Sequence, residues 1–491
     1  MISQQLMKAT SFVILCSSVL CGIAIAQPLS EPIPLDQLKP KGQWESVNMP
    51  ETLDLAERAE LSVHVLTENL VPAKAYAVAG LVPNMEVTAS ASWNLPTKNA
   101  RALPLMRTMC GSEENLDIEQ ALMKTLIGQI SEDGLFYYPQ DSDGAPKGYS
   151  YLLVNGLMTL ALTTRYSMDQ NPKWLDHVEL IAKGLRNTAI QVEDRAYYPP
   201  ESSINAEGQW AFTRRALSPP KFPYNPPEEP HMEQQGVESC VKWEQSAEVK
   251  ALVKDVIHNG NQSSLETALK VARFMLKPGL WEDTLAKGYP GQEHGVWAGH
   301  FHAHMGALQS LLDLAVATHD EKLKQIVRDG YHEGIQQGVI RMGFVPGWSV
   351  PQVYIDHNVP SRNGTAEGCG IADTLILATK LSDAGVGDYW DDVDSLVRNL
   401  LTEFQVMPAD LDFIRNYYAQ DKTKNPGDVE RFIGGFGQNF PTAKDPVVHG
   451  CCTANSSIAL YYAWHGITRF DRDTATVNLF LNRCTPWMNV L

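Results

Sequence analysis

The sequence predicts an all-α fold, a closed toroid of helical hairpins known as an (α/α)6 barrel. Segments with apolar residues at helical spacing follow one another along most of the chain, about a dozen in all. The sequence Asp-Gly-Leu-Phe-Tyr-Tyr-Pro at 133–139 recurs as Asp-Arg-Ala-Tyr-Tyr-Pro at 194–199, and each copy follows a helical segment at a similar distance. Helix pairs that repeat with matching loops bury their faces against their neighbours, which favours a toroid.

The expected helices begin and end at recognisable signals. Asp117 is expected to cap one helix, with Gln120 three residues later completing a capping box. Pro172 is expected at the first position of another helix, where its missing N–H costs nothing. The expected helices cover residues 53–70, 117–130, 150–166, 171–190, 247–258, 264–275, 304–317, 321–340, 370–382, 389–404 and 456–470.

The chain is expected to begin with an export signal. Residues 1–26 contain an apolar run and end in Ala24-Ile25-Ala26, which fits the small-residue rule for cleavage after Ala26. The run is too short to cross a bilayer comfortably, and no membrane span is expected elsewhere. Residues 27–50 are predicted to be a proline-rich linker, and residues 51–472 the all-α catalytic core. A secreted or periplasmic location follows.

Charge and cysteine content exclude other classes of protein. The formal net charge of −17 argues against a nucleic-acid partner, because binding phosphates requires clustered lysine and arginine. Six of the eight cysteines lie after residue 26. Six thiols in so long a chain are too few for a disulfide scaffold, which is typical of short secreted domains.

Three of these thiols form a pattern with one carboxylate. Cys451 and Cys452 are adjacent and precede an apolar helical run, and Glu367 and Cys369 lie about eighty residues earlier. Three thiols and a carboxylate are ligands that zinc accepts, and four such ligands complete a tetrahedral site. A buried pair of free thiols and a disulfide are the alternatives that the spacing leaves open.

Four segments together resemble the β-L-arabinofuranosidases of glycoside hydrolase family 127. They are Glu367-x-Cys369, residues 371–384, Tyr-Trp-Asp-Asp-Val at 389–393, and Cys451-Cys452 before a helix. The resemblance implies an (α/α)6 barrel, with Glu367, Cys369, Cys451 and Cys452 as zinc ligands and Cys451 as the nucleophile. It also implies that residues 473–491, where 474–481 alternates like a strand, are the first strand of a C-terminal β-sandwich that is cut off.

The proposed chemistry needs a second catalytic group. Zinc coordination deprotonates a thiol, so Cys451 would act as a thiolate. A retaining glycosidase also needs a group that protonates the leaving oxygen and then activates water. In the family a glutamate lies sixteen residues before the glutamate ligand, but here that position is Pro351. Asp356 is the predicted replacement, and Glu282 and Glu293 are alternatives.

Histidines flank both halves of the expected site. His300 matches a substrate-contacting histidine of the family by its distance from the following helix, and His302 is the near alternative. His449, beside the cysteine pair, is expected to orient a ligand or to contact sugar. The alternation of His300, His302 and His304 also leaves open a second metal site or purely structural histidines.

These expectations converge on one function. The protein is expected to be an exported, retaining glycoside hydrolase with zinc as its cofactor. Its carbohydrate substrate is expected to be a terminal β-L-arabinofuranoside or a related plant or algal sugar. Two alternatives remain: a lyase or epimerase on the same toroid, and a non-catalytic, zinc-stabilised carbohydrate-binding protein.

Overall fold

The computed structural model describes most of the chain after residue 52. The described residues are 53–79, 94–139, 147–199, 202–212, 243–277, 299–349, 366–420, 429–438, 447–471, 473–485 and 488–490. The predicted signal peptide (residues 1–26) and linker (residues 27–50) lie outside them, and both stay predictions. No helix in the described ranges combines the length and the hydropathy that crossing a bilayer requires.

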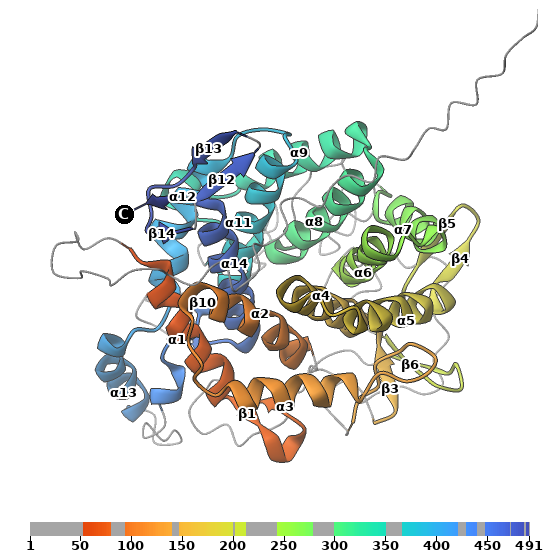
Figure 1. Cartoon of the computed structure of the whole chain (residues 1–491), viewed down its shortest axis with the longest axis horizontal. Helices are drawn as coiled ribbons and strands as arrows, with labels where there is room; N and C mark the ends of the chain where they lie inside the picture. The colour runs from red at the N-terminus through yellow and green to blue at the C-terminus, as the bar shows by residue number, and fades with distance from the viewer. Residues whose placement is uncertain are drawn as a thin grey trace, which may run out of the picture.

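Six long helices within the described residues form a closed inner ring (Figure 1). Each packs against the next along the chain, and the last packs against the first. They are α2 (Asn94–Cys110), α4 (Leu152–Asp169), α6 (Trp243–Asn259), α8 (Phe301–Thr318), α11 (Gly368–Asp383) and α14 (Gly450–Gly466). The ring confirms the predicted (α/α)6 barrel.

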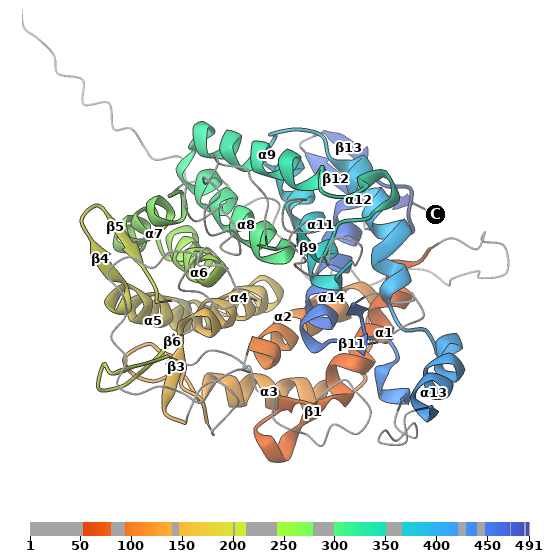
Figure 2. The ribbon, with the colours of Figure 1, turned by 180° about the vertical axis from the view of Figure 1, so that it is seen from behind.

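A second set of helices lies outside this ring, as the view from behind also shows (Figure 2). They are α1 (Leu55–Glu68), α3 (Leu116–Ile127), α5 (Lys173–Thr188), α7 (Gln262–Met275), α9 (Glu321–Ile335) and α12 (Trp390–Leu396). Along the chain an outer helix precedes each inner one. Because the two helices of a hairpin run antiparallel, all the inner helices run in the same direction. Their N-terminal ends therefore lie at one end of the ring.

The side-chain pattern explains which helices are inside. In α8 every residue from Phe301 to Leu312 is buried, as expected of a helix surrounded by others. In α9 the buried positions include Leu323, Val327 and Tyr331, which recur every four residues among charged ones. The apolar stripe of α9 packs against the inner ring, and the opposite face of α9 lies in solvent.

The strands are short and antiparallel. They are β1 (Leu70–Val71) with β2 (Ala77–Val78), β3 (Tyr149–Tyr151) with β6 (Ser202–Asn205) and β7 (Trp210–Phe212), β4 (Ile190–Val192) with β5 (Arg195–Tyr197), β8 (Gly299–His300) with β9 (Trp348–Ser349), β10 (Gly437–Gln438) with β11 (Val447–Val448), β12 (Thr468–Asp471) with β13 (Thr474–Val477), and β14 (Arg483–Cys484) with β15 (Asn489–Val490). Strands β3, β8 and β11 lead directly, or after one residue, into α4, α8 and α14. These pairings fix the direction in which the chain enters three inner helices.

Four inner helices begin earlier than predicted, among them α6 at Trp243 instead of residue 247 and α11 at Gly368 instead of residue 370. Helix α8 begins at Phe301 instead of residue 304, and α14 begins at Gly450 instead of residue 456. The prediction for α14 rested on its apolar run, but its first turns are small polar residues with tertiary hydrogen bonds. Thr453 bonds with the backbone of Phe436, for example. Packing against neighbouring elements therefore determines where these helices begin. No periodic spacing of apolar residues in the sequence marks these positions.

Other boundaries also differ from the predictions. Helix α3 begins at Leu116 after Asn115, so Asp117 lies in the first turn, where its charge favours the positive end of the helix dipole. Pro172 precedes the first residue of α5. The predicted helix 321–340 ends early, at Ile335. The predicted helix 389–404 is helical to its end, but only residues up to Leu396 are α-helical, and a π-turn and a 3-10 turn follow without a break. The remaining helical pieces are α13 (Leu411–Ala419), a π-turn (Val397–Leu401) and 3-10 turns at Pro72–Lys74, Ile340–Met342, Thr402–Phe404, Pro408–Asp410 and Glu430–Phe432.

The C-terminal region holds a hairpin where one strand was expected. Strand β13 ends at Val477, earlier than the predicted 481, and pairs with β12 in a register that joins Thr468 to Val477 and Asp471 to Thr474. The β-sandwich that residues 473–491 were predicted to begin stays a prediction.

Ring closure depends on close approach of α4 and α6 at Gly156. A Cβ atom there would lie 2.3 Å from the carbonyl carbon of Ala247, and backbone atoms have no freedom to yield. We expect Gly156→Ala to lower the free energy of unfolding by about 1–3 kcal/mol, measured by urea denaturation. The control is Gly128→Ala after α3, where the nearest atoms would lie at 3.4 and 3.5 Å. Equal stability of the two variants would contradict this packing.

Candidate metal centre and active site

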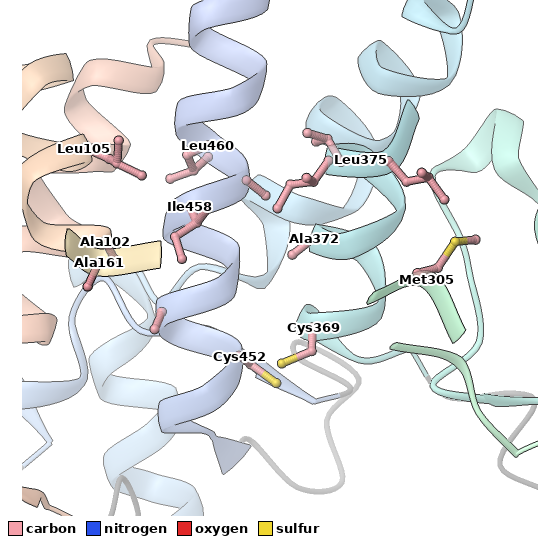
Figure 3. Close-up of a cluster of buried hydrophobic side chains, with 14 of the residues drawn as sticks. Ala102, Leu105, Ala161, Met305, Cys369, Ala372, Leu375, Cys452, Ile458 and Leu460 are labelled. Carbon is pink, nitrogen blue, oxygen red and sulfur yellow. The ribbon is translucent and has the colours of Figure 1, made fainter. Parts of the chain in front are cut away.

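The candidate site lies where the first turns of α8, α11 and α14 meet. Glu367 precedes the first residue of α11 and Cys369 is in its first turn. Cys451 and Cys452 are in the first turn of α14. Figure 3 shows Cys369 and Cys452 pointing toward each other from these two helices. The early start of α14 therefore places both cysteines on a helix.

Apolar packing and one glycine bring the two helices together. Side chains such as Ala372 of α11 and Ile458 of α14 are buried in the core above the thiols (Figure 3). A Cβ at Gly368 would lie 3.1 Å from the Cβ of Cys452, so the missing side chain lets the first turns approach. The hydroxyl of Ser456 also donates to the carbonyl of Gly368 at 3.3 Å.

The four predicted ligands converge on one point. One atom each of Glu367, Cys369, Cys451 and Cys452 lies within 4.8 Å of all the others. The three cysteines are free thiols, which does not fit the alternative of a disulfide. Three sulfurs and one carboxylate oxygen at this spacing match a tetrahedral zinc site in kind and number. The residues present therefore fit the metal that the resemblance implies.

The thiols of the cluster differ in the direction in which their pKa is shifted. Hydrogen bonds from Cys369 and Cys452 hold the pKa of the Cys451 thiol well below its ordinary value, and His449 and Lys98 lower it further by their charge. Burial raises the pKa of Cys369 instead. Among the three thiols of the cluster, Cys451 is therefore the one that ionises most readily, and it is half-buried whereas the other two cysteines are buried.

Glu367 is ionised and held by a histidine. Its Oε2 lies 2.7 Å from Nε2 of His300, and its Oε1 lies 3.9 Å from Sγ of Cys452. Burial alone would raise the pKa of Glu367, but the neighbouring imidazole of His300 outweighs it, and the net pKa is lowered. A histidine bonded to a ligating carboxylate orients that ligand. The predicted contact of His300 with substrate stays a prediction.

His302 lies beside His300, the histidine that is bonded to Glu367. Its Nδ1 is bonded to Oδ2 of Asp373, and its ring is 5.2 Å from that of His300. Trp243 covers it at 4.4 Å between ring centroids. A Cβ at Gly306 would lie 2.3 Å from the indole, so Gly306 provides the space that Trp243 occupies.

The predicted alternative of a second metal site on alternate histidines has no support in the described residues. The two groups there that have metal-binding geometry are the thiol cluster and an exposed set, His64 with Glu68 and Glu114. Neither includes His302 or His304. The physical reason is helical geometry: residues two apart in α8 project about 200° apart around its axis.

The site contains residues that the sequence analysis missed. Asp373 is the only carboxylate between residues 368 and 382, inside an otherwise apolar helix, and such a buried charge is a recognisable signal. Lys98 is buried at 4% exposure with its ammonium 6.0 Å from the Trp243 ring centroid. Nothing in the local pattern around Lys98 or Trp243 marks them. His449 precedes α14, and Asp356, Glu282 and Glu293 lie outside the described residues.

No family model and no curated protein matches the sequence. Solved structures do match. An unsaturated glucuronyl hydrolase specific for heparin matches with a TM-score of 0.50 and 11% identity, covering 84% of this chain and 97% of its own. A sugar epimerase from a ruminal bacterium matches with a TM-score of 0.50 and 12% identity, covering 84% and 99%.

A GH127 β-arabinofuranosidase also matches, with a TM-score of 0.48 and 13% identity over 87% of this chain. The match covers 60% of that structure's length. At identities this low, the similarities establish the fold alone. The chain is an α/α-toroid protein, a fold that it shares with glycoside hydrolases and a sugar epimerase.

The lowered pKa of Cys451 predicts selective alkylation. In reduced, chelator-treated protein, iodoacetamide should label Cys451 at about pH 6, where an ordinary thiol is largely protonated. Burial raises the pKa of Cys110, at the end of α2, so Cys110 should require a higher pH and serves as the internal control. Peptide mass spectrometry across a pH series measures both. The same pH dependence for both thiols would rule out a thiolate at Cys451.

Proposed function

We propose that the protein is a retaining glycoside hydrolase whose nucleophile is the thiolate of Cys451. The observation that carries the proposal is the convergence of three thiols and a carboxylate at the N-terminal end of the inner ring, with the lowered pKa on the most accessible of the three sulfurs. The resemblance supports a terminal β-L-arabinofuranoside, or a related plant or algal sugar, as substrate. Secretion or periplasmic location stays a prediction from the N-terminal sequence.

Zinc is the cofactor of this proposal. Glu367, Cys369, Cys451 and Cys452 would hold it, and when bound it keeps its thiol ligands deprotonated. The remaining contacts orient the ligands. His300 holds Glu367, and the amide of Asn455 donates to Sγ of Cys369 at 3.3 Å. The first turn of α14 adds the positive end of its dipole near Cys451.

The proposed reaction has two steps. Sγ of Cys451 bonds to the anomeric carbon while the bond from that carbon to the leaving oxygen breaks, and the leaving oxygen takes a proton. Water then bonds to the anomeric carbon, loses a proton and releases the thiolate, so the anomeric configuration is retained. Asp356, the acid/base candidate from the sequence, lies outside the described residues, and its role stays a prediction.

The nucleophile is tested by substitution. Wild-type protein should release nitrophenolate from 4-nitrophenyl β-L-arabinofuranoside, and Cys451→Ser should lower the rate by roughly 10⁴-fold or more, as expected for loss of a covalent nucleophile. Cys110→Ser, far from the site, should keep wild-type activity. Mass spectrometry of acid-quenched protein should find the sugar on the peptide that contains Cys451.

One combination of results would contradict the hydrolase proposal. A wild-type protein that contains zinc, releases nothing from any substituted arabinofuranoside and leaves Cys451 unglycosylated would contradict the hydrolase. The zinc-stabilised carbohydrate-binding protein would then be the better account of the same cluster.

A further inference from the structure

We infer that His302, held by Asp373, is the group that passes protons to and from the oxygen atoms in this reaction. The inference rests on the proposed function and names the second catalytic group that it requires. It is carried by a chain of contacts that crosses three inner helices, from Lys250 of α6 through Gln309 of α8 to Asp373 of α11.

The bond between His302 and Asp373 fixes the histidine's orientation. Asp373 is 7% exposed, and burial alone would raise its pKa, but the imidazole of His302 together with the charges of Lys250 and Lys98 outweighs burial and lowers it. The carboxylate is therefore ionised and only accepts hydrogen bonds, so Nδ1 of His302 carries the proton between them. Among the described residues Nε2 of His302 has no hydrogen-bond partner, which leaves this nitrogen to exchange a proton with a ligand.

Asp373 is itself held in place. The amide of Gln309 donates to Oδ1 of Asp373 at 3.0 Å and to its backbone carbonyl at 2.9 Å. Nζ of Lys250 donates to Oε1 of Gln309 at 2.9 Å. A buried polar chain is costly unless each member is satisfied, and here each one finds a partner on a neighbouring helix. The carboxylate therefore faces His302 in a fixed orientation.

Contacts through His300 connect His302 to the thiol cluster. The ring of His302 contacts the rings of Trp243 and His300, with centroid distances of 4.4 and 5.2 Å, and these two contacts restrict the imidazole. His300 is bonded to Glu367, one of the four converging residues. A carboxylate oxygen of Glu367 lies within 4.8 Å of Sγ of Cys451. The imidazole and the thiolate therefore lie around the same carboxylate, as an acid and a nucleophile acting on one sugar must.

The proton transfers complete both steps. In the first, Sγ of Cys451 bonds to the anomeric carbon, the carbon–oxygen bond breaks, and the proton on Nε2 of His302 moves to the departing oxygen. In the second, neutral Nε2 takes a proton from water as the water oxygen bonds to the anomeric carbon and the carbon–sulfur bond breaks. The thiolate and the imidazolium are both regenerated. Asp373 acts as a positioning residue that stabilises the imidazolium.

Leaving-group dependence tests this role, because an acid matters only for poor leaving groups. His302→Gln should lower kcat/KM for phenyl β-L-arabinofuranoside by about 10²–10⁴-fold and that for the 2,4-dinitrophenyl glycoside by less than about tenfold. Turnover of the dinitrophenyl glycoside should become a burst followed by a slow phase, and added azide should speed the slow phase because it needs no base. Asp373→Asn should give the same pattern in weaker form.

Controls separate catalysis from folding. His332→Gln alters an exposed histidine on α9 that bonds Tyr389, and should leave all these rates unchanged. Melting temperature and zinc content of His302→Gln and Asp373→Asn show whether the site is intact. Uniform slowing of both glycosides in His302→Gln, with no effect of azide, would overturn this inference alone. Wild-type protein inert even to the dinitrophenyl glycoside would overturn the role of Cys451 and this inference with it.

Discussion

All six inner helices run in one direction, so their first turns meet at one end of the ring, and the site depends on this constraint. The four converging residues and His302 all come from such a turn or the residue before it. Glu367 and Cys369 come from α11, Cys451 and Cys452 from α14, and His302 from α8.

The cost of burying negative charge explains why cationic side chains lie near the thiols. Placing a carboxylate and a thiolate in a buried site is costly unless neighbouring charges compensate. His300 lowers the pKa of Glu367 against the effect of burial, and Lys98 adds to the hydrogen bonds of Cys369 and Cys452 that lower the pKa of Cys451. These groups favour the ionised forms that a metal ligand and a nucleophile both require.

The sequence was sufficient for the architecture and for the four converging residues, because helical periodicity and the Cys451-Cys452 pair are local signals. It was insufficient for the groups around them. Trp243 contacts His302 only because α6 and α8 are neighbours in the ring, and Asp373 is hydrogen-bonded to His302 from a third helix, α11. Such pairings depend on tertiary packing, which also set the early starts of α8 and α14 that local propensity did not predict.

The central claim is that three sulfurs and one carboxylate oxygen bind zinc at this end of the ring. X-ray absorption at the zinc edge, on purified and reduced wild-type protein, tests it most directly. The account predicts about one zinc per chain, with three sulfur neighbours at about 2.3 Å and one oxygen neighbour at about 2.0–2.2 Å. A protein without zinc, or zinc surrounded only by nitrogen and oxygen, would contradict it.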